Sequence, residues 1–172
     1  MEKPTLYMET TIPSYLLAEP SRDVISLARQ EITRTWWKRD QARYAIFVSE
    51  VVIEEVGKGD PGEAEKRRKF LEQFPVLQAA PEIQRLIEVY LEENVVPAGS
   101  GEDAAHLAFA SIHQIDFLCT WNFKHLANVF ALRRLRQVNE KRDFLFRRYA
   151  RLRNYSEDDR WRPIRFYEKY TG

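Results

Sequence analysis

Short apolar runs alternate with helical stretches along the chain. The apolar runs lie at residues 6–8, 44–48, 76–77 and 117–120, and they lack the period-two alternation of a sheet with one solvent-facing side. Between them, apolar residues recur at spacings of three and four, as in helices with one buried face. This pattern predicts an α/β fold, specifically a three-layer α/β/α sandwich with a central parallel sheet.

The longest helical stretch follows Pro20 and Ser21. Its apolar residues fall on one side of a helix and predict one buried stripe. The members of this stripe are Val24, Ile25, Ala28, Ile32 and Trp36. Trp36 and its neighbour Trp37 are expected to serve packing or a dimer surface rather than base stacking.

Capping residues and helix breakers set the other boundaries. Thr11 is expected to cap a short helix after the first strand, and Ser49 a helix after the second. Residues 57–62, with three glycines and a proline, break the helical pattern. Residues 103–113 are expected to form an Ala-rich helix, and a further helix is expected from about His125.

Composition adds few constraints to this picture. With 172 residues, 44% of them hydrophobic and 31% charged, the chain suits one soluble globular domain. The apolar runs are too short to cross a membrane, and the N-terminal residues lack the apolar core of a secretory signal. Cys119 is the single cysteine, which excludes an intramolecular disulfide and favours a reducing cytoplasm. We expect it to be a small buried strand residue.

Charge is distributed unevenly. Residues 133–172 contain 13 basic and 6 acidic side chains, a net charge of +7, whereas residues 1–132 carry −6. The basic end either contacts nucleic-acid phosphates or docks as a solvated helix face on the acidic body. We therefore expect a domain of residues 1–137 and a basic extension of residues 138–172 packed on it, with residues 163–166 as a candidate edge strand. Its clustered arginines are Arg133, Arg134, Arg136, Arg147, Arg148, Arg151 and Arg153, of which 134, 148 and 151 are candidates for one helical face.

Four polar side chains lie at the expected strand-to-helix junctions. They are Glu9, Glu55, Asp103 and Asn122. In a parallel sheet such junctions gather along one edge, outside the carboxyl ends of the strands, where ligands bind. Three carboxylates drawn together would repel one another without a cation. The sequence therefore predicts a divalent-metal site, and hard oxygen ligands favour magnesium or manganese over zinc.

Each of these residues also has an ordinary structural interpretation. Glu54 falls almost opposite the apolar arc of its helix and should face water, while Glu55 lies on the border of that arc. Glu55 is therefore the candidate for the site. The alternative is that Glu55 is a surface carboxylate beside the core. Glu9 is equally placed to cap the helix that follows it.

The remaining two positions have similar alternatives. Asp103 completes a capping-box pattern with Ser100, although a residue in the first turn can still face a cation. Asn122 suits an Asx turn after its strand. His106 follows Asp103 on the same helix face and either ligates a transition metal or serves as a hydrogen-bonding or packing residue.

Four segments resemble, in order and spacing, the motifs of PIN domains, in particular the VapC-type toxins of type II toxin–antitoxin systems. The segments are 7–12 (YMETTI), 49–56 (SEVVIEEV), 103–108 (DAAHLA) and 118–125 (LCTWNFKH). The resemblance covers residues 5–130. It implies a Mg²⁺- or Mn²⁺-dependent endoribonuclease with an RNA substrate and a possible cognate antitoxin protein. We also expect the protein to be cytoplasmic and homodimeric.

By motif position, the resemblance assigns metal-ligand roles to Glu9, Glu55 and Asp103, with Asn122 at the fourth acidic position. Thr120 matches the hydroxyl residue that the family often has two positions before the fourth acidic residue. At positions 9 and 122 the family usually has aspartate. These departures favour an alternative, in which a degenerate PIN domain binds RNA or a protein partner without cleavage. A domain that binds a phosphorylated small molecule is disfavoured, because no Gly-rich loop follows the first strand.

Overall fold

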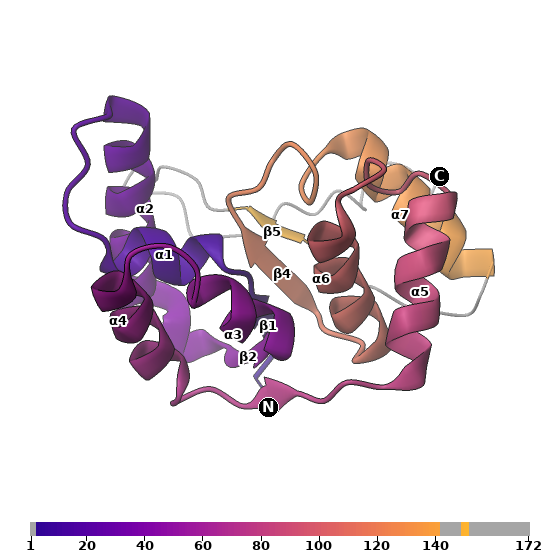
Figure 1. Cartoon of the computed structure of the whole chain (residues 1–172), viewed down its shortest axis with the longest axis horizontal. Helices are drawn as coiled ribbons and strands as arrows, with labels where there is room; N and C mark the ends of the chain where they lie inside the picture. The colour runs from indigo at the N-terminus through magenta and orange to yellow at the C-terminus, as the bar shows by residue number, and fades with distance from the viewer. Residues whose placement is uncertain (1–2, 142–148, 152–172) are drawn as a thin grey trace.

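Five strands form one parallel sheet within residues 3–141 and 149–151, the part of the chain that the computed structural model describes (Figure 1). The strands are β1 (Thr5–Met8), β2 (Ala45–Ser49), β3 (Val76–Leu77), β4 (Phe117–Thr120) and β5 (Tyr149–Arg151). Their order is β3-β2-β1-β4-β5, and all neighbours pair in parallel. β1 is therefore the central strand.

Helices connect the strands and cover the sheet on both sides (Figure 1). They are α1 (Thr11–Leu17), α2 (Val24–Asp40), α3 (Glu50–Val56), α4 (Pro61–Leu71), α5 (Pro81–Glu92), α6 (Gly101–Ile112) and α7 (Val129–Lys141), with a short 3-10 turn at Gln41–Arg43. The prediction of a three-layer α/β/α fold with a central parallel sheet is confirmed. Among the described residues, no helix is both long and apolar enough to cross a membrane.

The core explains why the strands lack alternation. Leu6, Tyr7 and Met8 of β1 are fully buried, as are Leu118 and Cys119 of β4. A strand with helices over both faces has no solvent side, so each position favours an apolar residue. Burying a leucine side chain stabilises the fold by about 1.5–3 kcal/mol. The expectation of a buried Cys119 is confirmed.

The strand order creates a switch point beside β1. From β1 the chain proceeds through β2 to β3 on one side, and β4 and β5 lie on the other side. The connections after β1 and β4 consequently leave the sheet in opposite directions and open a crevice at the carboxyl ends of these two strands. Glu9 follows β1 directly, and Trp121 and Asn122 follow β4.

The predicted buried stripe of α2 is wrong. Val24 is 78% exposed and Ile25 65% exposed, Ala28 is exposed and Ile32 is only partly buried. Trp36 alone of the five is fully buried. The helix instead buries a face that includes Gln30, Thr33 and Asp40.

Hydrogen bonds make this polar face suitable for burial. The Gln30 side chain donates to the carbonyl of Glu19 and accepts from the amide of Ser21, both at 2.9 Å. Thr33 Oγ1 accepts from the indole nitrogen of Trp121 at 2.8 Å. Because these polar groups are satisfied, their burial costs little free energy. Val24 and Ile25, in the first turn of α2, lie on the exposed side of the helix.

Helix boundaries agree with the sequence in part. Ser49 caps α3, with its hydroxyl accepting from the amide of Val52 at 3.5 Å. Thr11 is not a cap: it lies inside α1, whose cap position is Thr10 and has no side-chain capping bond. The helix expected from about His125 begins at Val129 instead.

The C-terminal expectations fall mostly outside the described residues. The proposed boundary between residues 137 and 138 lies inside α7. Arg151 belongs to strand β5, so it does not share a helical face with Arg134. The candidate edge strand at residues 163–166 and the arginines at 147, 148 and 153 lie outside the described part of the chain.

Candidate metal centre

Glu9 is held at the end of β1 by both backbone and side-chain bonds. Its amide donates to the carbonyl of Cys119 in β4 at 3.1 Å, and its own carbonyl accepts from Ile12 as α1 begins. Glu9 Oε2 accepts from the hydroxyls of Thr11 and Thr120, the latter at 2.8 Å. The side chain is only 5% exposed, so its carboxylate is fixed in the crevice beside β4.

Glu55 reaches the same crevice from α3. Its Oε2 accepts from the hydroxyl of Thr10 and contacts His106 Nε2 at 3.0 Å. The side chain is 15% exposed, whereas the neighbouring Glu54 is exposed to solvent. The predicted distinction between the two glutamates is confirmed, because the helical arc decides which of them faces the sheet edge.

His106 completes the cluster from α6. Its Nδ1 lies 2.8 Å from the hydroxyl of Tyr7, which in turn lies 2.6 Å from Ser49 Oγ. One carboxylate oxygen each from Glu9 and Glu55 and one ring nitrogen of His106 lie within 4.8 Å of one another. Elements far apart in sequence (β1, α3 and α6) therefore converge on one point.

The charges of this cluster shift its pKa values. Burial raises the pKa of Glu9, against the charge of His106 and the hydrogen bonds from Thr11 and Thr120. Burial acts in the same direction on Glu55, but the hydrogen bond and charge of His106 outweigh it and lower the pKa of that carboxyl. For His106, burial would lower the pKa, yet the hydrogen bond to Glu55 and the charges of Glu9 and Glu55 raise it.

Asp103 and Asn122 form a separate group beside this cluster. Asn122 Nδ2 donates to Asp103 Oδ1 at 2.7 Å, and His125 Nδ1 lies 2.6 Å from Asp103 Oδ2. The side-chain oxygen of Asn122 accepts from the amide of His125 at 3.1 Å. This last bond supports the turn interpretation of Asn122, since both polar atoms of its side chain have partners.

Thr120 joins the two groups. Its hydroxyl donates to Glu9 and accepts from the amide of Asn122, both at 2.8 Å. The capping box expected for Asp103 does not form: Ser100 makes no side-chain cap bond, and both carboxylate oxygens of Asp103 have the partners described above. All five predicted site residues thus lie along one edge, but only Glu9 and Glu55 belong to the cluster with His106.

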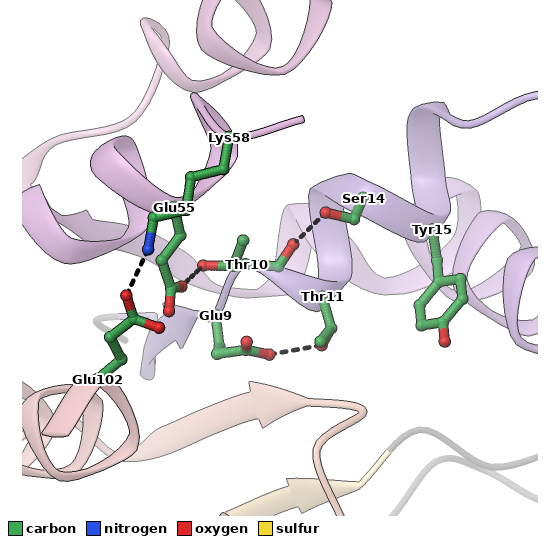
Figure 2. Close-up of a pocket in the computed structure, with 8 residues that line it drawn as sticks. All are labelled: Glu9, Thr10, Thr11, Ser14, Tyr15, Glu55, Lys58 and Glu102. Atoms are coloured by element: carbon green, nitrogen blue, oxygen red, sulfur yellow. Dashed lines mark hydrogen bonds and ion pairs between the residues drawn. The ribbon is translucent and has the colours of Figure 1, made fainter. Parts of the chain in front are cut away.

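A cavity of about 370 Å³ opens at this edge, within the size range of ligand sites. Its lining consists of Glu9, Thr10, Thr11, Ser14, Tyr15, Glu55, Lys58 and Glu102 (Figure 2). Lys58 and Glu102 form an ion pair across the rim, between the end of α3 and the start of α6. The cavity floor is therefore acidic, and the pair closes one end of it.

The donor set suits a divalent cation. A buried and a partly buried carboxylate side by side need positive compensation, which a protonated His106 or a metal ion supplies. His106 Nε2 faces the carboxylates, while Tyr7 and Ser49 support Nδ1 in the manner of the outer partners of metal-ligating histidines. Carboxylate oxygens with one imidazole nitrogen favour Mn²⁺ over Mg²⁺, since Mg²⁺ prefers oxygen ligands alone.

No protein-family model matches the sequence, and no curated protein matches it significantly.

Several residues of the cavity were not assigned to the site from sequence. Lys58 and Glu102 carried no signal beyond their position near Glu55 and Asp103, and Tyr15 had none. The sequence does indicate His106 as a candidate, because it lies one turn after Asp103 on the same helix. What the spacing did not show is that the two side chains have different partners, Asp103 being bonded to Asn122 and His106 to Glu55.

Proposed function

We propose that the protein is a divalent-metal-dependent endoribonuclease of the PIN-domain type, with Mn²⁺ or Mg²⁺ as its cofactor. The observation that carries the proposal is the convergence of Glu9, Glu55 and His106 within 4.8 Å, at the switch point of a parallel sheet. The ordered motif resemblance adds the substrate class. A role as the toxin of a toxin–antitoxin pair, a cognate antitoxin and a homodimeric state belong to the same proposal.

The chain's own residues have distinct roles in this mechanism. Glu9 and Glu55 would hold the cation, and His106 Nε2 is placed to join them once it has lost its proton. Thr11 and Thr120 fix Glu9 by hydrogen bonds to Oε2, so its carboxylate needs no reorganisation. A bound divalent ion polarises a phosphoryl oxygen and lowers the pKa of an attacking water.

Asp103 would serve at the margin of the site. In the structure its oxygens are bonded to Asn122 and His125, which orients the carboxylate toward the end of β4. Asp103 then contributes negative charge to the crevice, and His125 offers a ring that is positioned by that carboxylate.

The testing experiment is RNA cleavage by the purified full-length chain, with Mn²⁺ and with EDTA. Glu55→Gln should abolish cleavage, because it removes one carboxylate of the cluster, while Glu54→Gln, its exposed neighbour, should leave cleavage unchanged. Asp103→Asn should lower activity and leave thermal stability nearly intact. Equal cleavage by wild type and the Glu55→Gln variant would remove the assigned site.

The second candidate is a PIN-like domain that binds RNA or a protein partner without cutting. Its supporting observation is that Asn122 and Asp103 are bonded to each other and that His106 compensates Glu55, so the cluster has a cation-free arrangement. In the cleavage assay, this candidate predicts intact RNA at every Mn²⁺ concentration together with retained RNA binding.

A further inference from the structure

The end of the cavity opposite the Lys58–Glu102 pair is aromatic. Tyr15 projects from α1 and lines the same cavity as Glu9 and Glu55, on the side away from that ion pair (Figure 2). The Tyr15 side chain is only partly buried. A ligand held at the acidic floor would therefore extend toward this ring.

Contacts from two other elements fix the Tyr15 ring. Arg29 Nη1 in α2 donates to the Tyr15 hydroxyl at 3.0 Å, so the guanidinium meets the ring at its hydroxyl end. The Trp121 ring lies edge-on to Tyr15, with centroids 6.1 Å apart and planes at 77°. Trp121 is itself anchored through its indole nitrogen to Thr33 and through its amide to Thr11. A ring held in this way loses little side-chain entropy when a planar group stacks on it.

Arg29 provides a positive charge at this end of the cavity. Its guanidinium carbon lies 5.7 Å from the centre of the Trp121 ring and 5.9 Å from that of Tyr15. Among residues 3–141, no carboxylate forms a direct ion pair with Arg29, whereas Arg34 on the same helix pairs with Glu31. The pKa of the exposed Asp23 is lowered by its hydrogen bonds with Ser26 and, without a direct contact, by the charge of Arg29. A partly buried guanidinium with no carboxylate of the described residues in direct contact suits a phosphate, which it can bind through paired N–H donors.

We propose that Tyr15 and Arg29 form a subsite for one unpaired nucleotide of single-stranded RNA. Its base stacks on Tyr15 and its phosphate bonds to Arg29, while the neighbouring phosphodiester lies over Glu9 and Glu55. An aromatic ring can receive only a base that is free of its duplex partner, so the subsite selects single-stranded regions. The identity of the ligand as RNA rests on the proposed function; the subsite itself rests on the Tyr15, Arg29 and Trp121 contacts.

The test is binding of a fluorescein-labelled single-stranded oligoribonucleotide to the full chain in EDTA, measured by anisotropy. EDTA prevents cleavage, so affinity is read without chemistry. Tyr15→Leu should weaken binding about tenfold, the size of one lost base-stacking contact, and Tyr15→Phe should restore most of it. Phe130→Leu is the matched control, because Phe130 is 83% exposed on α7, and it should bind like wild type.

Arg29→Gln tests the phosphate contact separately. It should lower affinity and make the slope of log affinity against log salt shallower by about 0.7, the contribution of one phosphate on a single strand. Lys38→Gln removes one charge from an exposed site on the same helix and should leave the slope unchanged. If circular dichroism shows that Tyr15→Leu does not fold, the Arg29→Gln variant still tests the subsite.

The outcomes separate this proposal from the nuclease proposal. Wild-type affinity in Tyr15→Leu, or an unchanged salt slope in Arg29→Gln, would overturn the subsite even if the wild type cleaves RNA. Equal losses of affinity for single-stranded and double-stranded RNA would overturn it as well. Tyr15-dependent binding in a protein that never cleaves RNA would support the subsite and refute the nuclease.

Discussion

Replacing Glu9 by glutamine should stabilise the metal-free protein and remove its response to manganese. Glutamine has nearly the same size, and its side-chain oxygen can still accept from Thr11 and Thr120. Burial raises the pKa of Glu9, so the stability linked to this group is present below its ordinary pKa and is lost as pH rises through the raised value. In EDTA at neutral pH, the wild type therefore loses the free energy of unfolding that is linked to Glu9, and the Glu9→Gln variant does not.

Bound manganese should stabilise the wild type more than the Glu9→Gln variant. A cation at a hundred times its dissociation constant stabilises the native state by about 2.7 kcal/mol. For a chain of this size, each kcal/mol moves the melting temperature by about 2–4 °C, so manganese should raise the wild-type Tm by about 5–11 °C. In Glu9→Gln most of that rise should vanish, because one of two carboxylates of the cluster is gone.

The assay is differential scanning fluorimetry in EDTA and in MnCl₂, with Glu54→Gln as the matched control. Glu54 is exposed on α3, so its loss of charge should change neither the Tm in EDTA nor the manganese-induced rise. The reasoning is refuted if Glu9→Gln keeps the full rise with manganese, or if it melts below the wild type in EDTA.

Three further predictions follow from the same contacts. Thr120→Val should cost about 1–3 kcal/mol in urea denaturation, because it leaves the amide of Asn122 without its partner and removes one of the two hydroxyls that donate to Glu9 Oε2; an unchanged midpoint would count against that. Asn122→Asp should lower the Tm in EDTA, by placing a second carboxylate against Asp103, and should enlarge the rise with manganese; calorimetry showing identical manganese binding would confine Asn122 to its turn. Manganese affinity should increase with pH, because Glu9 and His106, whose pKa values are both raised, must release their protons; a titration series with flat affinity from acid to neutral pH would contradict the ligand set.

Local sequence signals located four of the five described strands, β1 to β4, but not β5. Fully buried apolar runs such as residues 6–8 and 117–120 predict a parallel sheet, because only strands covered on both faces lack alternation. Ser49 was recognised as a cap because capping depends on neighbours three residues away. Glu55 was distinguished from Glu54 by helical geometry alone.

Long-range contacts limited the rest. The stripe of α2 was assigned to the wrong face, because spacing identifies a face but not whether polar residues such as Gln30 find partners elsewhere. The central position of His106 depends on Tyr7, which lies 99 residues away in sequence. The division between Glu9–Glu55 and Asp103–Asn122 likewise follows from how α6 and the turn after β4 are placed, which no local pattern encodes.

The most direct test of the central claim is an electron paramagnetic resonance titration of the purified full-length protein with Mn²⁺. The signal of free aqueous Mn²⁺ falls as the ion binds, so the measurement counts occupied sites without any substrate. We predict a saturable loss of the free-ion signal in the wild type, which Glu54→Gln preserves and which Glu55→Gln and Glu9→Gln each abolish. A free-ion signal that the wild type leaves undiminished, or a loss that is equal in all four proteins, would contradict a metal centre built on Glu9, Glu55 and His106.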